Sequence, residues 1–140
     1  MVQRDVASQK IARARAFLAD AEPVLSLPRA EFLVNRKERD LALFYLFLAI
    51  QECIDLATHW IADEGLPPAD DYAASFEILA ERGRIEPLLA QQMAGAAGLR
   101  NLIAHGYAAV DPSRVHEEAA EGIAAMRRFM EAVARVSGAD

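Results

Sequence analysis

The chain has 140 residues, of which 54% are hydrophobic and 26% are charged, and its formal net charge is −6 at pH 7. The length and composition predict one folded domain over residues 1–140 and exclude a largely disordered chain. The negative net charge excludes a protein that holds nucleic acid through a broad basic surface, although it is compatible with a small local site on RNA.

The cysteine content and the apolar runs bear on the cellular compartment. The single cysteine, Cys53, cannot form an intrachain disulfide, which favours a reduced, cytoplasmic protein. Residues 1–5 lack the apolar segment of a signal peptide. The longest apolar run, Leu41–Ile50, has ten residues, whereas about 20 are needed to span a bilayer. We therefore expect a cytoplasmic protein that has no membrane partner.

Apolar residues recur at helical spacing almost throughout the sequence, and no stretch alternates as a strand does, so we expect an all-α fold. The first helix is predicted over Arg4–Leu25, with Pro23 near its end and a break at Pro28 before the next helix. Its buried stripe is predicted to comprise Ala7, Ile11, Ala14, Leu18, Ala21 and Leu25.

The second helix is predicted to be the longest, beginning at Arg29 or at Lys37 and ending at Asp63. The buried stripe of its second half is predicted to comprise Leu46, Ile50, Cys53, Ile54, Ala57, Trp60 and Ile61. In its first half the opposite face is also apolar and consists of Leu41, Phe44, Tyr45 and Leu48. A helix that is apolar all round must be covered on two sides, either at the centre of a monomer or by a second subunit. We take this pattern to indicate a homodimer with two-fold symmetry.

A short helix is predicted to follow a loop that is rich in proline. Either Asp70 or Asp71 can cap its start, and Gly83 is expected at its end. The inward-facing residues of this helix are predicted to be Tyr72, Phe76 and Leu79.

Two more helices complete the predicted bundle. Pro87 fits the first turn of one helix, which is expected to end at Gly106. Its inward-facing residues are predicted to be Leu88, Leu89, Met93 and Ala96. Asp111 followed by Pro112 predicts the start of the last helix, where His116 is expected to be solvated. We therefore expect an antiparallel bundle of four main helices plus one short helix.

The stretch Arg100–Tyr107 places a permanent cation, an imidazole, a glycine and a phenol within eight residues. On an ideal helix, five residues turn through roughly 140°, so Arg100 and His105 would not share one face. A helix that ends at Gly106 would release His105 and Tyr107 from the helical register. The spacing is therefore compatible with convergence of these side chains at a helix end.

These residue types suit metal-independent cleavage of RNA, in which a ribose 2′-OH attacks the neighbouring phosphate without any cofactor. His105 can act as base or acid near neutral pH, and Arg100 matches phosphate geometry with two parallel donors. Asn101 can donate to phosphate or orient His105, and Tyr107 can hydrogen-bond to phosphate or stack on a base. The same side chains also admit structural roles: an ion pair for Arg100, a helix C-terminal cap for His105 and a surface aromatic for Tyr107.

A second polar group lies on the long helix, where Glu52, Asp55 and His59 share a face. Such a set can ligate a metal, but no other helix offers a matching acidic pair at core-facing positions, so we expect no metal site. We expect instead that Glu52 or Asp55 supports the cleft beside Arg100–Tyr107 or faces water. Cys53 lies on the apolar side and is expected to be a core residue.

The spacing of Arg100, His105 and Tyr107 resembles the Arg-x4-His-x-Tyr motif of the HepT-like toxins, a branch of the HEPN superfamily. The similarity extends over nearly the whole chain in the same order. Besides the motif, it covers Ala49–Ala57, Phe76–Gly83 and Arg128–Phe129.

The resemblance implies an all-α HEPN bundle that forms a homodimer, with the two motifs facing a shared cleft. It implies an RNA-cleaving toxin of a type VII toxin–antitoxin pair, in which Arg100 and His105 are the catalytic pair. The partner implied is a nucleotidyltransferase of the MNT class, which inactivates the toxin by transferring AMP to the motif tyrosine, here Tyr107. The alternative is a non-catalytic module of the same fold that binds nucleotide or the partner nucleotidyltransferase.

Overall fold

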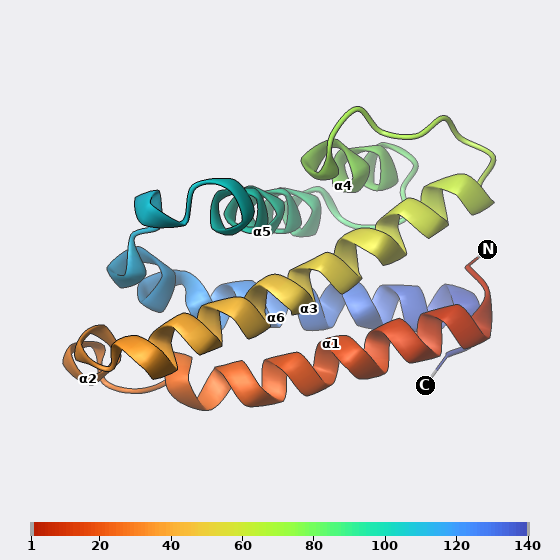
Figure 1. The fold of residues 1–140 in the computed structure, drawn as a ribbon. Coiled ribbons are helices and arrows are strands. Elements are labelled where there is room, and N and C mark those ends of the chain that lie inside the picture. Colours follow the sequence, from red (N-terminus) through yellow and green to blue (C-terminus); the bar gives the residue numbers. More distant parts are fainter. Residues whose placement is uncertain (1, 140) are drawn as a thin grey trace.

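A computed structural model describes residues 2–139 of the chain, and the all-α prediction is confirmed over that range. The helices are α1 (Arg4–Leu25), α2 (Arg29–Val34), α3 (Arg36–Asp63), α4 (Tyr72–Glu81), α5 (Pro87–His105), the 3-10 helix η1 (Tyr107–Ala109) and α6 (Pro112–Ser137). Successive long helices α1, α3, α5 and α6 run in alternating directions, as Figure 1 shows. The ends of α1 and α6 that carry the N- and C-termini lie at the same end of the bundle.

The helix starts follow the capping signals of the sequence. Asp71, rather than Asp70, caps α4, because its carboxylate accepts a hydrogen bond from the Ala74 amide at 2.8 Å. Asp111 caps α6 and accepts from the backbone amides of Ser113 and Arg114 at 3.0 and 3.4 Å. Each bond satisfies an amide that has no partner inside its helix.

The predicted second helix is two helices, so the bundle has two short α-helices, α2 and α4, rather than one. The two starting points left open by the sequence, Arg29 and Lys37, fall at or next to the starts of α2 and α3. Asn35 separates them with a non-helical backbone (φ −86°, ψ 70°). Its amide still bonds to the Glu31 carbonyl, and its carbonyl accepts from Arg39, so the chain turns without losing these backbone bonds.

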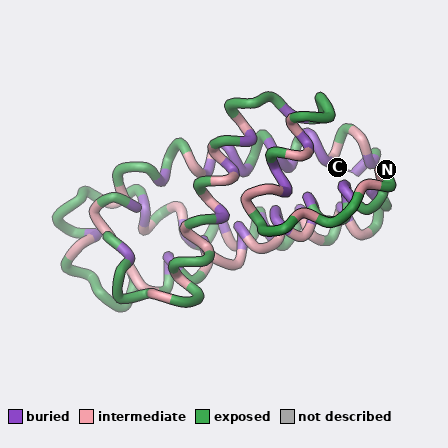
Figure 2. The backbone as a smooth tube through the Cα atoms, turned by 90° about the horizontal axis from the view of Figure 1, so that it is seen from above, coloured by how far each residue is buried: buried purple, intermediate pink, exposed green. Residues whose placement is uncertain are grey.

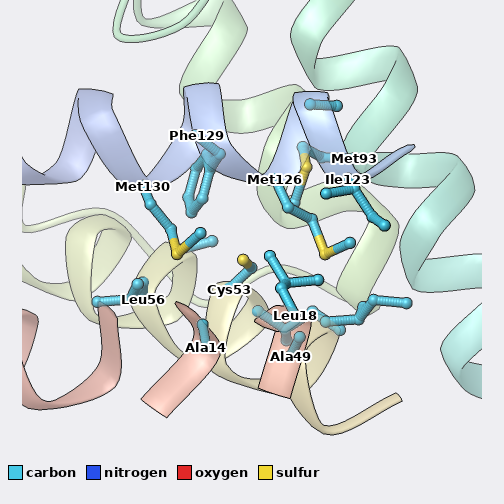
Figure 3. Packing of buried hydrophobic residues seen from close by; sticks show 14 of the residues in the cluster. Ala14, Leu18, Ala49, Cys53, Leu56, Met93, Ile123, Met126, Phe129 and Met130 are labelled. Carbon is cyan, nitrogen blue, oxygen red and sulfur yellow. The ribbon is translucent and has the colours of Figure 1, made fainter. Parts of the chain in front are cut away.

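The core lies between α1, α3, α5 and α6, all of which contribute side chains that are labelled in Figure 3, and α3 packs against each of the other three. Every residue of the predicted α1 stripe and of the predicted stripe in the second half of α3 is buried. Phe129 of α6 packs edge-to-face on Phe76 of α4, with ring centroids 5.1 Å apart, and contacts Trp60 of α3 at 6.3 Å. This aromatic cluster joins α4 to the bundle.

Three predictions about individual side chains are wrong. Tyr72 and Leu88 were expected to face inward but are 37% and 62% exposed, because both lie in the first turn of a helix at the margin of the core. His116 was expected to be solvated, but its Nε2 lies 2.6 Å from the Leu27 carbonyl oxygen and its ring packs against Phe32. His116 thus ties α6 to the loop that follows α1.

The central helix α3 is long and apolar enough, by length and composition, to cross a membrane, and half of its most apolar window is buried inside the bundle. Its apolar character therefore has an explanation in core packing. Of the four residues on the other apolar face, Tyr45 and Leu48 are half-buried, and Tyr45 stacks on Phe17 of α1. Leu41 and Phe44 remain about half exposed. Figure 2 shows the buried positions lining the inside of the bundle.

Candidate functional site

Arg100 projects from α5 into a cage of four side chains, namely Phe47, Gln51, Tyr72 and Asn101. Its guanidinium carbon lies 5.2 Å from the ring centre of Phe47 and 4.9 Å from that of Tyr72. Nε donates to Gln51 Oε1 at 2.7 Å, and Nη1 donates to Asn101 Oδ1 at 3.0 Å. These bonds account for two of the five guanidinium N–H groups. The aromatic contacts and the hydrogen bonds together fix the plane of the cation.

Gln51 of α3 connects Arg100 to a cluster of charged side chains between α3 and α1. Its Nε2 donates to Asp55 Oδ1 at 3.0 Å, and Lys10 of α1 lies 3.3 Å from Asp55 Oδ2. Asp55 therefore reaches Arg100 through Gln51. Glu52 pairs with Arg13 at 3.1 Å and with Lys10 at 3.6 Å, so its carboxylate joins α3 to α1. Of the two acidic residues expected to support the cleft, only Asp55 is connected to Arg100.

The ion pairs also bear on the metal site considered from the sequence. Glu52 and Asp55 both face Lys10, whose positive charge occupies the position a cation would take. Within residues 2–139, no group of three or more histidine, cysteine or acidic side chains is arranged to hold a metal ion.

His105 is the last residue of α5 and is exposed to solvent. Gly106 caps the helix and donates its amide to the Leu102 carbonyl at 2.8 Å. Arg100 and His105 both lie inside α5, so helix geometry directs their side chains about 140° apart around the axis. His105 would leave this register only if the helix ended before it, whereas α5 includes it. Across the described part of the chain, no hydrogen bond joins the two side chains.

Tyr107 has left the α5 register and lies in the 3-10 helix η1. Its hydroxyl donates to Asp40 Oδ1 of α3 at 2.6 Å. Burial, this hydrogen bond and the negative charge of Asp40 raise the pKa of Tyr107 to about 12, while the charges of Arg39 and Arg36 oppose the rise. Tyr107 is still 40% exposed, so part of the residue lies at the surface.

Sequence reasoning missed four residues of this site, namely Asp40, Phe47, Gln51 and Tyr72. Three of them lie seven and four residues apart on α3, which is the spacing of one helix face. These three residues are directed toward α5 and η1. Their helical spacing was the signal in the sequence from which a shared face could have been predicted. Nothing in the local sequence marks Tyr72, which meets Arg100 only through the packing of α4 beside α5.

A groove of about 540 Å³ lies between α5 and α6, on a different side of α5 from the Arg100 cage. Its apolar floor includes Leu99, Leu102 and Ile123, and its rim carries Arg114 and Glu118. Gly95, Gly98 and Gly122 also line it, and a Cβ built at any of the three would meet nothing within 4 Å. The groove is therefore open space between the two helices.

The profile of the Ribonuclease HepT-like family matches residues 9–133, which include the whole Arg100 cage and the Asp40–Tyr107 pair. The chain belongs to the HepT-like ribonuclease family. The resemblance seen in the sequence is thereby confirmed.

Individual relatives agree with the family assignment. A putative RNase of Archaeoglobus fulgidus is 33% identical over 92 residues, which are 65% of this chain and 69% of the relative. A tri-AMPylated HEPN toxin of Shewanella oneidensis, in complex with an MNT antitoxin, superposes with a TM-score of 0.84 at 22% identity, over 92% of this chain and 96% of that one. A tyrosine-to-alanine mutant of the toxin–antitoxin pair MntA–HpeT superposes with a TM-score of 0.83 at 20% identity, over 91% of this chain and 97% of that one. The fold is thus that of HEPN toxins.

Proposed function

We propose that this protein is the ribonuclease toxin of a two-protein toxin–antitoxin pair and that it cleaves RNA without a metal. The observation that carries the proposal is the caged guanidinium of Arg100, five residues before an exposed histidine, in a chain of the HepT-like ribonuclease family. A cation whose plane is fixed before substrate binds needs no reorganisation when charge develops on a phosphate.

In the proposed reaction, the ribose 2′-oxygen attacks the adjacent phosphorus, and the bond from phosphorus to the 5′-oxygen breaks. His105 takes the proton from the 2′-OH while water protonates the departing 5′-oxygen, or His105 protonates the 5′-oxygen while water takes the proton from the 2′-OH. Arg100 donates to the non-bridging oxygens, on which negative charge accumulates. Asn101, whose Oδ1 accepts from Arg100, donates its amide N–H to the flanking phosphate, and the ring of Tyr107 stacks on a base while its hydroxyl stays bonded to Asp40.

We further propose that the active form is a cytoplasmic homodimer in which two copies of Arg100–Tyr107 face one cleft. Two observations support it. Arg100 and His105 point in different directions from one helix, so a second subunit is needed to bring an arginine and a histidine together. Leu41 and Phe44 also leave apolar surface exposed on the first half of α3.

The partner we propose is an MNT-class nucleotidyltransferase that switches the toxin off by transferring AMP to Tyr107. The partial exposure of Tyr107, at 40%, supports this role, as does the fold shared with a tri-AMPylated HEPN toxin bound to an MNT antitoxin. The bulk and charge of AMP at this position would block access to the end of α5.

Growth of cells that express the chain without its partner tests the nuclease. We expect growth arrest with the wild-type protein and relief with His105→Ala. His59→Ala, which removes another exposed histidine from α3, is the matched control and should remain toxic. Purified protein should cleave RNA in the presence of EDTA. Equal growth of the wild-type and His105→Ala strains, with both proteins expressed and folded, would refute the nuclease proposal and leave the non-catalytic binding module.

A further inference from the structure

The hydrogen bond between Tyr107 and Asp40 joins residues 67 positions apart, and its oxygen–oxygen distance is 2.6 Å. The bond places a carboxylate oxygen on the proton of the hydroxyl that would accept AMP. We propose that Asp40 is the general base that takes this proton during AMP transfer to Tyr107. This inference rests on the modification of Tyr107 proposed above.

The surroundings of Asp40 suit such a role. Arg36 and Arg39 lie 3.8 and 3.7 Å from its two carboxylate oxygens, so two positive charges surround one negative charge. The cluster therefore carries a net charge of about +1, and a phosphodiester on Tyr107 would bring it to neutrality. Arg36 is 84% exposed at its side chain and is free to turn toward an incoming phosphate. A carboxylate without these cations would repel the nucleotide.

Tyr107 Oη attacks the α-phosphorus of ATP, which the nucleotidyltransferase binds as co-substrate. A bond forms between Oη and that phosphorus, and the bond from the phosphorus to the bridging oxygen of pyrophosphate breaks. The hydroxyl proton moves to Asp40 Oδ1, and pyrophosphate leaves with the bonding electron pair. Asp40 contacts the attacking atom itself, so it acts directly in the reaction.

A base is needed because the phenol does not ionise by itself near neutral pH. The pKa of Tyr107 is raised to about 12, so its phenolate is scarce at pH 7. The charged groups around the hydroxyl are Asp40, Arg36 and Arg39 of α3, and His105 precedes it at the end of α5. Of these, Asp40 is the one that accepts the hydroxyl hydrogen bond.

The test measures the rate at which the purified nucleotidyltransferase and ATP add AMP to the full-length chain, followed by intact mass, with Tyr107→Phe locating the site. We expect Asp40→Asn to slow the addition about 100-fold or more, in the range that general-base catalysis supplies. Asp40→Glu should recover part of the rate. Glu38→Gln, which removes an exposed carboxylate from the same helix, should leave the rate unchanged. Melting curves check that each variant is folded.

The pH dependence separates a base from a residue that only positions the tyrosine. Without a base, the reaction requires the phenolate, so the rate of Asp40→Asn relative to wild type should rise about tenfold per pH unit between pH 7 and 9. A wild-type rate for Asp40→Asn, or the same loss at every pH, would overturn this role of Asp40 while leaving the modification intact. A wild-type chain that gains no AMP at Tyr107 would overturn both the modification and the role of Asp40.

Discussion

Replacing Gln51 with leucine removes the acceptor that holds Nε of Arg100 and keeps a side chain of similar size on α3. The lost bond is short, at 2.7 Å, and its donor is charged. Hydrogen bonds to charged groups contribute about 1.5–3 kcal/mol. Since each 1.36 kcal/mol is tenfold in rate, full expression of that loss in the transition state lowers cleavage about 10- to 150-fold. Phe47 and Tyr72 still hold the guanidinium, so we expect a value near the lower limit.

The assay is the initial rate of cleavage of an RNA substrate by purified protein, with the melting temperature as a check of folding. Gln91→Leu is the matched control, because Gln91 is an exposed glutamine on α5, and its cleavage rate should equal that of the wild-type protein. Unchanged cleavage by Gln51→Leu would show that the fixed plane of Arg100 is irrelevant to the reaction. Faster cleavage would show that Gln51 restrains Arg100 rather than presenting it, and either result would refute the reasoning.

Three further predictions concern buried or shielded groups. Phe129→Ala should lower the free energy of unfolding by about 3–5 kcal/mol in chemical denaturation, because it leaves a cavity beside Phe76 in the centre of the bundle. Cys53 should resist thiol reagents at pH 8 until the protein is unfolded, since burial raises its pKa to about 12. The phenolate absorbance of Tyr107, isolated by comparison with Tyr107→Phe, should appear near pH 12, and at lower pH in Asp40→Asn. Because the folded pKa lies above the ordinary value near 10, the contribution of Tyr107 to stability should be complete below pH 10 and lost as the pH rises to 12.

Local signals predicted the helices well, because each depends on a few neighbouring residues. Asp111 with Pro112 begins a helix through bonds to amides two and three positions along, and Gly106 ends one in the same local way. The break at Asn35 escaped prediction since it involves neither proline nor glycine and its flanking sequences are both helical. The break accompanies the packing of α2 against both α3 and α6, which the local sequence does not specify.

In the candidate site, too, the residues that are close in sequence were predicted and their distant partners were not. Arg100, His105 and Tyr107 lie close together in the sequence, so their motif was recognisable. Their partners are contributed from elsewhere: Asp40 is 67 residues from Tyr107, and Gln51 is 49 residues from Arg100. Such contacts depend on which helix faces lie together. The sequence indicates which residues share one face of a helix, but it does not indicate which side chains of other helices that face contacts.

The arrangement of Asp40, Phe47 and Gln51 on α3 constrains the length of this helix segment in the present chain. One of these residues holds the tyrosine of η1, and the other two hold the arginine of α5, so a single helix sets the distance between the two functional ends of the motif. Deleting one residue of α3 between positions 40 and 47 would rotate Asp40 by about 100° relative to Phe47 and Gln51 and shift it by about 1.5 Å. The number of residues in this segment of α3 therefore keeps the partner of Tyr107 in register with the partners of Arg100.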